Sequence, residues 1–102
     1  MKNNLQVDPE VIGPEEAREM LKNLVPQYRP PDSHYVELFA DVMRRGKWVP
    51  TYETIKIDVR PGTVARLVDG RRRLLAIIES GAEIEFLVMR GPFELFDPAE
   101  EN

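Results

Sequence analysis

Three consecutive arginines follow an Asp-Gly pair in the second half of the chain, where Asp69 and Gly70 precede Arg71, Arg72 and Arg73. The pattern is typical of a strand end, a tight turn and the first turn of a helix. Unpaired N–H groups and a partial positive charge mark the start of a helix, so each cation there is unfavourable by about 0.3–1 kcal/mol. A bound anion would offset this repulsion. The five residues therefore predict a phosphate-binding turn.

Each residue type in this turn suits that chemistry. Gly70 permits a sharp turn and a close approach of the backbone to a ligand. Arg72 and Arg73 would add forked, charge-assisted hydrogen bonds to those of the backbone N–H groups. Asp69 would orient an arginine, a ribose hydroxyl or Mg²⁺. Two alternatives stay open: Asp69 caps the helix, and the three arginines form an ordinary solvated helix face.

Further residues outside the turn are accessory candidates. Lys47 and Arg66 are additional cations that would contact phosphates. Trp48 follows the expected end of a helix, where it would stack on a base or pack as a lid over that helix. The single histidine is His34. It needs a partner to act as a general base, and an exposed position is the alternative.

Composition narrows the possible classes of protein. The 102 residues have ordinary fractions of hydrophobic residues, 42%, and charged residues, 31%. They fit one domain, 1–102, with 1–4 and 98–102 expected to fray. The absence of cysteine excludes disulfides, thiolate metal sites and cysteine nucleophiles, and we expect no metal centre. No apolar stretch approaches the roughly 20 residues of a membrane span, and no signal peptide is evident. We therefore expect a cytoplasmic protein with no membrane partner.

The net charge of −4 hides an asymmetry along the chain. Residues 42–73 carry nine Lys or Arg against three acids, and the rest carries five against fifteen. A basic middle in an acidic chain permits a local anion site and argues against nucleic-acid binding over the whole surface. The alternative is that folding intermingles the two signs.

Hydrophobic spacing predicts a small α+β domain: a mixed sheet of about three to five short strands with three helices. The expected helices run from Gly13-Pro14 toward Pro26, from Asp32-Ser33 to Gly46 and from Asp69-Gly70 to Ser80-Gly81. The expected strands cover 54–59, 64–68 and 83–89, with an edge strand over 5–12 interrupted at Asp8-Pro9 and a last short element over 93–96. The first two should pair antiparallel across a turn at 60–63, and Gly91-Pro92 should break the third.

Two of these helices carry more specific expectations. In the first helix, Ala17, Met20, Leu21 and Leu24 should share one buried face. The second helix has an apolar stripe that Tyr35, Leu38 and Val42 widen, so we expect this helix to be central.

Short segments in a fixed order give the chain a family resemblance. They are Arg29-Pro30, Met43-Arg44-Arg45-Gly46-Lys47-Trp48, Ile55-Lys56-Ile57, Leu67-Val68-Asp69-Gly70-Arg71-Arg72-Arg73-Leu74-Leu75-Ala76, Ser80-Gly81 and Phe86-Leu87-Val88. This set resembles the ParB/sulfiredoxin-like superfamily, and most closely its phage- and plasmid-borne proteins with an Asp-Gly-Gln-His-Arg box. Arg71 and Arg72 replace Gln and His of that box, which shifts the segment toward the Gly-Glu-Arg-Arg box of ParB proteins.

The resemblance implies a nucleotide- or phosphate-binding regulatory or accessory module of phage or mobile-element origin. Its ligand would be CTP, as for ParB, or ATP, as for sulfiredoxin, with Mg²⁺, and Arg29 would reach the ligand from its connector. Sulfiredoxin's sulfinic-acid chemistry requires a cysteine that this chain lacks, and we expect no enzyme.

Three other functions stay open. They are DNA binding through Arg71, Arg72 and Arg73, a phosphotransferase or nuclease, and a module that binds a host or phage protein. The sequence leaves a homodimer open.

Overall fold

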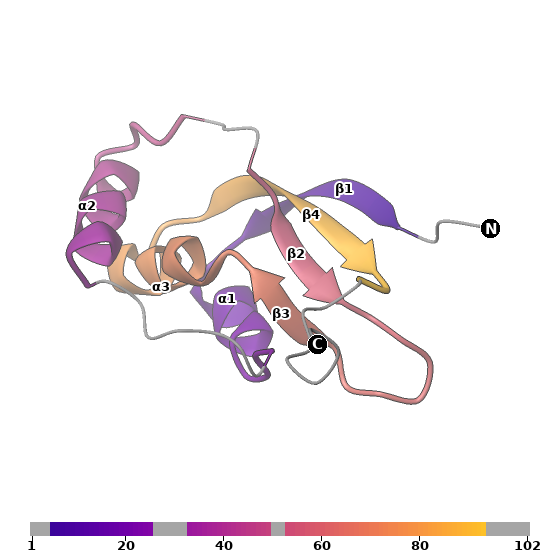
Figure 1. Ribbon diagram of the computed structural model, residues 1–102. Helices are drawn as coiled ribbons and strands as arrows, with labels where there is room; N and C mark the ends of the chain where they lie inside the picture. The colour runs from indigo at the N-terminus through magenta and orange to yellow at the C-terminus, as the bar shows by residue number, and fades with distance from the viewer. Residues whose placement is uncertain (1–4, 26–32, 50–52, 94–102) are drawn as a thin grey trace, which may run out of the picture.

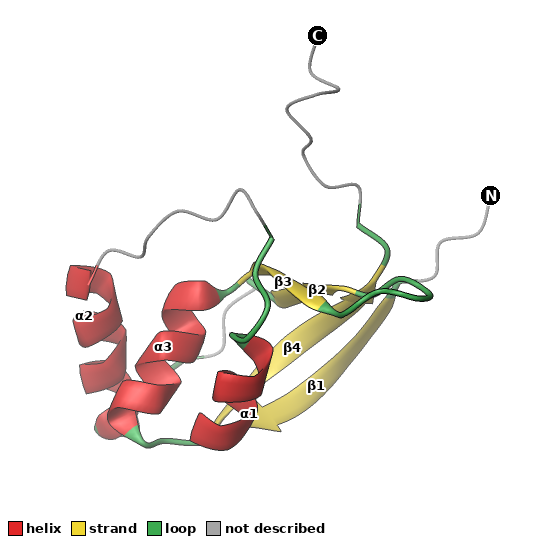
Figure 2. Cartoon of the chain, turned by 90° about the horizontal axis from the view of Figure 1, so that it is seen from below, coloured by secondary structure: helices red, strands yellow, loops and turns green. Residues whose placement is uncertain are grey.

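A four-stranded mixed sheet lies on one side of the molecule and three helices lie on the other (Figures 1 and 2). This computed structural model describes residues 5–25, 33–49 and 53–93. The elements are β1 (Gln6–Ile12), α1 (Pro14–Met20), α2 (Ser33–Arg44), β2 (Ile55–Asp58), β3 (Arg66–Asp69), α3 (Arg71–Ser80) and β4 (Ile84–Gly91). The predicted α+β class, with three helices and a mixed sheet, is confirmed. Among the described residues, no helix has the length and apolar character that crossing a membrane requires.

The strand order is β1-β4-β2-β3, so the last strand of the chain lies in the middle of the sheet. β4 runs antiparallel to β1 and parallel to β2. β2 and β3 pair antiparallel, as predicted, with an irregularity between Lys56 and Ile57. This arrangement places the end of β3 directly before α3, and thus fixes where the Asp-Gly turn lies.

α3 is the central helix, because it packs against α1 on one side and α2 on the other (Figure 2). Its Leu74 and Ile77 are fully buried and join Ile55, Leu67 and Val88 of the sheet in one core. Leucine and isoleucine at a spacing of three residues lie on the same face of a helix, which explains this packing.

The expectation that the second helix is central was wrong. α2 is the outer helix, packed on α3 at the margin of the molecule (Figure 1). Its stripe of Val36, Ala40 and Met43 is buried, but Tyr35 is 43% exposed and Leu38 is 47% exposed. The apolar stripe is wide because α2 carries exposed apolar residues as well as buried ones.

The first helix begins at Pro14 as predicted, and the Gly13 N–H donates to Glu16 Oε1 at 2.9 Å. It ends at Met20, however, well before Pro26, so Leu24 is not on its buried face. Leu24 instead forms an isolated parallel bridge with Leu67. Residues 23–25 therefore satisfy backbone groups of β3 that would otherwise form an open sheet edge.

The predicted interruption of the first strand is also wrong, since β1 is continuous and Pro9 pairs opposite Leu87. Proline has no N–H to donate, and this is tolerated because β1 lies at an edge of the sheet. β4 runs to Gly91, which pairs with Asp58, so this strand extends two residues beyond its expected end at Met89. Of the short element expected over 93–96, Phe93 has no regular structure and the rest lies outside the described residues, as do the ends expected to fray.

Candidate functional site

Gly70 is the residue immediately before α3 and has a left-handed conformation, with φ 118° and ψ 12°. Its carbonyl accepts the first hydrogen bond of the helix, from the Leu74 N–H at 3.0 Å. A Cβ added at Gly70 would lie 2.5 Å from Ile55 Cδ1. The sequence attributed this glycine to close approach of a ligand; the close approach in the structure is to the buried Ile55 side chain. Glycine is thus required here by backbone geometry and by packing.

Asp69 does not cap α3, which overturns one of the two alternatives for this residue. It is the last residue of β3, paired with Lys56, and the helix has no side-chain cap hydrogen bond. Its carboxylate instead lies 3.7 Å from Nη2 of Arg73. Asp69 therefore faces a cation of the predicted site, as the prediction that it orients an arginine requires.

The three arginines of the turn differ in environment. Arg73 is buried, with only 6% of its surface exposed, whereas Arg72 is exposed and Arg71 is half-buried. Arg73 lies on the helix face that also carries Ala76 and Ile77, three and four residues further along, and both are fully buried. This helical spacing is a signal in the sequence from which the burial of Arg73 follows.

The contacts of Arg73 leave its guanidinium incompletely bonded. Nε lies 3.8 Å from Oε1 of Glu53, and Nη2 lies 3.7 Å from Oδ1 of Asp69. Both ion pairs are thus longer than hydrogen bonds. Cζ lies 5.8 Å from the centroid of the Phe86 ring, which is within the range of a cation–π contact. Nη1 is buried and has no hydrogen-bond partner among the described residues. A buried donor without an acceptor is costly, and a ligand oxygen would remove that cost.

Arg72 contacts Tyr35, which the sequence placed only in the apolar stripe of the second helix. Its Cζ lies 5.0 Å from the centroid of the Tyr35 ring on α2. His34 is exposed, the alternative weighed for it, and its ring packs edge-on to Tyr35 with the centroids 5.7 Å apart. Tyr35 and Glu53 lie near the turn only because of the tertiary structure. No local motif in the sequence predicts these contacts.

Among the accessory candidates, Trp48 packs between two aromatic rings. Its ring centroid is 5.3 Å from that of Phe39 on α2 and 5.8 Å from that of Phe86 on β4. This position agrees with the packing alternative, although the buried indole Nε1 has no hydrogen-bond partner in residues 5–25, 33–49 and 53–93. Lys47 is exposed, and Arg29 lies outside the described residues.

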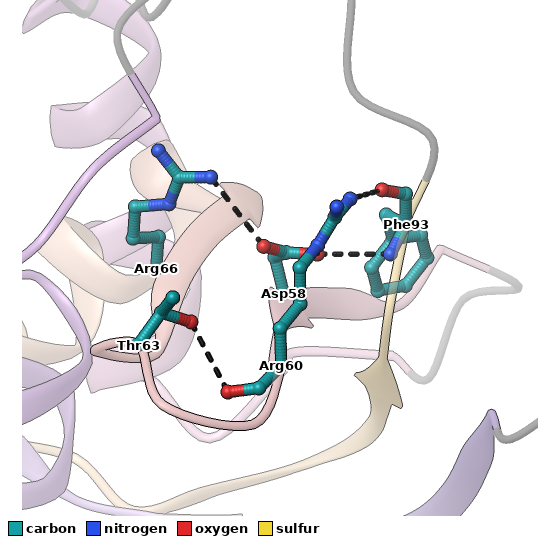
Figure 3. Close-up of polar contacts among 5 residues, drawn as sticks. All are labelled: Asp58, Arg60, Thr63, Arg66 and Phe93. Atoms are coloured by element: carbon teal, nitrogen blue, oxygen red, sulfur yellow. Dashed lines mark hydrogen bonds and ion pairs between the residues drawn. The ribbon is translucent and has the colours of Figure 1, made fainter.

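The structure does not bring Arg66 to the candidate site, contrary to prediction. Arg66 begins β3 and Asp69 ends it, so the two lie at opposite ends of the strand. Nη2 of Arg66 lies 3.5 Å from Asp58 Oδ2. Arg66 is therefore part of a second polar cluster, the Asp58 clamp, in which Asp58 is joined to Arg60, Arg66 and Phe93 (Figure 3).

The Asp58 clamp surrounds a carboxylate that is only 1% exposed. Oδ1 accepts hydrogen bonds from Nε of Arg60 at 3.0 Å and from the backbone N–H of Phe93 at 2.9 Å. Arg60 also donates through Nη2 to the Phe93 carbonyl, and Thr63 Oγ1 donates to the Arg60 carbonyl at 3.1 Å. Figure 3 shows that the two arginines approach the carboxylate from different sides. The clamp joins the β2–β3 turn to the chain that follows β4.

Burial of Asp58 acts to raise its pKa, but the opposing interactions prevail. The Phe93 N–H, the hydrogen bond and charge of Arg60, and the Arg66 hydrogen bond together lower the pKa of Asp58 below its ordinary value of 3.8. Each of these interactions favours the ionised form. The carboxylate is thus ionised and fully engaged at neutral pH, which assigns the clamp a structural role.

Folding intermingles much of the charge of the basic segment with acids, the alternative weighed above. Arg45 Nε lies 3.1 Å from Asp41, which also pairs with Arg44. Within the described part of the chain, no group of three or more His, Cys, Asp or Glu is arranged to hold a metal ion.

Comparison with known proteins adds no relative. The chain matches no protein-family model, no curated protein and no solved structure. The ParB/sulfiredoxin-like resemblance stays a prediction.

Proposed function

We propose that this protein is a nucleotide- or phosphate-binding module whose site is the start of α3. The observation that carries the proposal is the buried guanidinium of Arg73, whose Nη1 has no hydrogen-bond partner within the part of the chain that the structure describes. An orphaned, buried, positively charged donor at the N-terminal end of a helix is complementary to an anion. A phosphate oxygen would supply the missing acceptor.

The charges around this helix end favour a small anion. The carboxylates of Asp69 and Glu53 both face Arg73, and Arg71 and Arg72 add two further cations to the same turn of α3. Both carboxylates are more than half exposed and would remain hydrated when a ligand enters. Binding of extended DNA is less well supported, because Arg66, one of its expected contacts, pairs with Asp58.

Isothermal titration calorimetry with inorganic phosphate, CTP, ATP and GTP, each with and without Mg²⁺, tests the proposal. We expect binding by the native protein and loss of binding in Arg73→Met. Arg44→Met is the matched control, because Arg44 is an exposed arginine whose contact is a surface ion pair with Asp41. Absence of heat with every ligand at millimolar concentration, from protein whose folding circular dichroism has verified, would contradict the proposal.

A further inference from the structure

A groove lies between α2 and α3, the two helices that pack side by side at the margin of the molecule (Figures 1 and 2). Its volume is about 350 Å³. Each helix contributes three residues to its lining: Ser33, Val36 and Glu37 from α2, and Leu75, Ile78 and Glu79 from α3. Residues three and four positions apart share one face of a helix. The groove is therefore bounded by one face of each helix.

The floor of the groove is apolar. Val36 is buried, and Leu75 and Ile78 are half-buried. The residues that precede the last two, Leu74 and Ile77, are fully buried in the core. α3 is thus apolar on two faces, of which one packs in the core and the other lines the groove. A helix that is apolar around most of its circumference is normally covered on more than one side.

The rim of the groove is acidic, because Glu37 of α2 and Glu79 of α3 are both exposed there. Neither carboxylate forms an ion pair within the described part of the chain. Glu79 also lies in the last turn of α3, which has no basic residue. A carboxylate is unfavourable at that end of a helix, because the helix dipole is negative there. A cation from outside the chain would relieve both effects.

An apolar floor between two unpaired carboxylates is complementary to apolar side chains that are flanked by cations. An amphipathic helix presents this pattern when Lys or Arg border its apolar stripe. We infer that the groove binds a basic amphipathic helix of a partner protein. The apolar stripe of that helix would pack on the floor, and its cations would pair with Glu37 and Glu79. This surface is separate from the proposed phosphate site.

Charge favours such a partner over a second copy of this chain. In a twofold dimer the same patch of both copies forms the interface. A dimer through this groove would therefore bring Glu37 and Glu79 of each copy close to those of the other. Like charges that face each other across an interface are unfavourable, and the net charge of −4 on each chain adds to the repulsion.

Three labelled synthetic peptides of about 18 residues, a length that can form an isolated helix, test the inference. The first has leucines at i, i+3, i+4 and i+7 with lysines beside them. The second has glutamates in place of the lysines, and the third has the composition of the first with the leucines spread around the helix. Fluorescence anisotropy gives their affinities. We expect the first peptide to bind at least about tenfold more tightly than either of the others.

A pair of matched double variants assigns the binding to the rim. Glu37→Gln with Glu79→Gln should weaken binding of the basic peptide by about 3- to 30-fold and reduce its dependence on salt. Glu15→Gln with Glu85→Gln changes the net charge equally, at exposed positions on α1 and β4 outside the groove lining. This control should stay within about twofold of native.

A second pair of variants tests the floor. Ile78→Ala should weaken binding of the basic peptide by at least about fivefold, because it removes apolar contact area. Val11→Ala is the control, since Val11 is an exposed valine on β1. Circular dichroism verifies that each variant is folded before its affinity is measured.

Several outcomes would overturn the inference. They are equal binding of the basic and scrambled peptides, native affinity in the Glu37→Gln, Glu79→Gln variant, and an equal loss in the Glu15→Gln, Glu85→Gln control. Sedimentation velocity of the protein alone addresses the other occupant. A dimer that dissociates in the Ile78→Ala variant would assign the groove to a second copy of this chain. None of these outcomes bears on phosphate binding at the start of α3.

Discussion

The two ends of β3 treat a buried charge in opposite ways. At its start, the carboxylate of Asp58 receives the Phe93 N–H and the guanidinium groups of Arg60 and Arg66. Just beyond its end, the guanidinium of Arg73 has two ion pairs longer than hydrogen bonds and one orphaned nitrogen. The four residues of β3 thus separate the Asp58 carboxylate, which is fully hydrogen-bonded, from the Arg73 guanidinium, which is not.

This difference predicts that the Asp58 clamp stabilises the fold, and it is the reason for proposing a ligand at Arg73. Removing a group from a satisfied buried network leaves its former partners unpaired and costs stability. Replacing an underbonded buried cation with an apolar side chain of similar volume is often neutral or favourable. Residues kept at such a position despite the cost are candidates for function. The contrast between Asp58 and Arg73 is therefore measurable.

The largest effect is expected at Gly70, which positions the start of α3. Gly70→Ala should lower the free energy of unfolding by about 2–5 kcal/mol, through backbone strain and the clash with Ile55 Cδ1. Gly81→Ala is the matched control, because Gly81 also has a positive φ, of 74°, but nothing within 4 Å of an added Cβ. Urea denaturation measures both, and equal losses would contradict the role of Ile55.

A double variant resolves the contribution of the clash. Ile55→Val removes the Cδ1 atom that a Cβ at Gly70 would meet. We expect Gly70→Ala to cost less in the Ile55→Val background than in the native one, with the strain from φ remaining. Strict additivity of the two substitutions would show that the contact does not matter.

The clamp should show the next largest effect. Asp58→Asn should lower the free energy of unfolding at pH 7 by about 1–3 kcal/mol, because the charge that Arg60 and Arg66 face is lost. Asp41→Asn, an exposed carboxylate paired with Arg44 and Arg45, is the control and should change stability by less than about 0.5 kcal/mol. If Asp58→Asn were as stable as Asp41→Asn, the contrast between the two ends of β3 would be contradicted.

Acid should diminish the advantage of Asp58. The pKa of this carboxyl is lower in the folded protein than its ordinary value of 3.8, so the unfolded chain takes up the proton first as pH falls. The stability that Asp58 contributes is present above pH 3.8 and is lost progressively below it. Urea titrations from pH 7 to pH 2.5 should therefore show native protein and Asp58→Asn converging, whereas a constant difference would contradict the assignment.

The smallest stability effect is expected at Arg73. Arg73→Met should leave the free energy of unfolding within about 1 kcal/mol of native, because it replaces an underbonded buried cation with an apolar side chain. Asp69 and Glu53 lose a partner but are exposed to water. A loss as large as that of Asp58→Asn in urea denaturation would make Arg73 a structural residue and remove the contrast between the two ends of β3.

Local signals in the sequence predicted the start of α3 well. Its bounds follow from Gly70, Gly81 and the apolar residues between them, which act through the backbone of their own segment. The sequence also predicted the β2–β3 hairpin, whose strands are adjacent along the chain. These features depend on residues close in sequence.

The features that failed depend on contacts between distant segments. Leu24 has the spacing of a helical residue. It pairs with Leu67 of β3 instead of continuing the first helix. From the sequence, Arg66 was a candidate site residue. In the folded protein it pairs with Asp58, which lies opposite it on β2. The pairing of Tyr35 with Arg72 requires the packing of α2 on α3, which no local pattern encodes. The sequence therefore predicted only some of the residues at the candidate site.

The most direct test of the central claim is a titration of ¹⁵N-labelled protein with inorganic phosphate, followed by ¹H–¹⁵N correlation spectra. We predict the largest and saturable shifts at the backbone N–H groups of Arg71, Arg72 and Arg73, with little change at Arg60 and Arg66. Saturable shifts that are largest around the Asp58 clamp, or an absence of saturable shifts, would contradict a phosphate site at the start of α3.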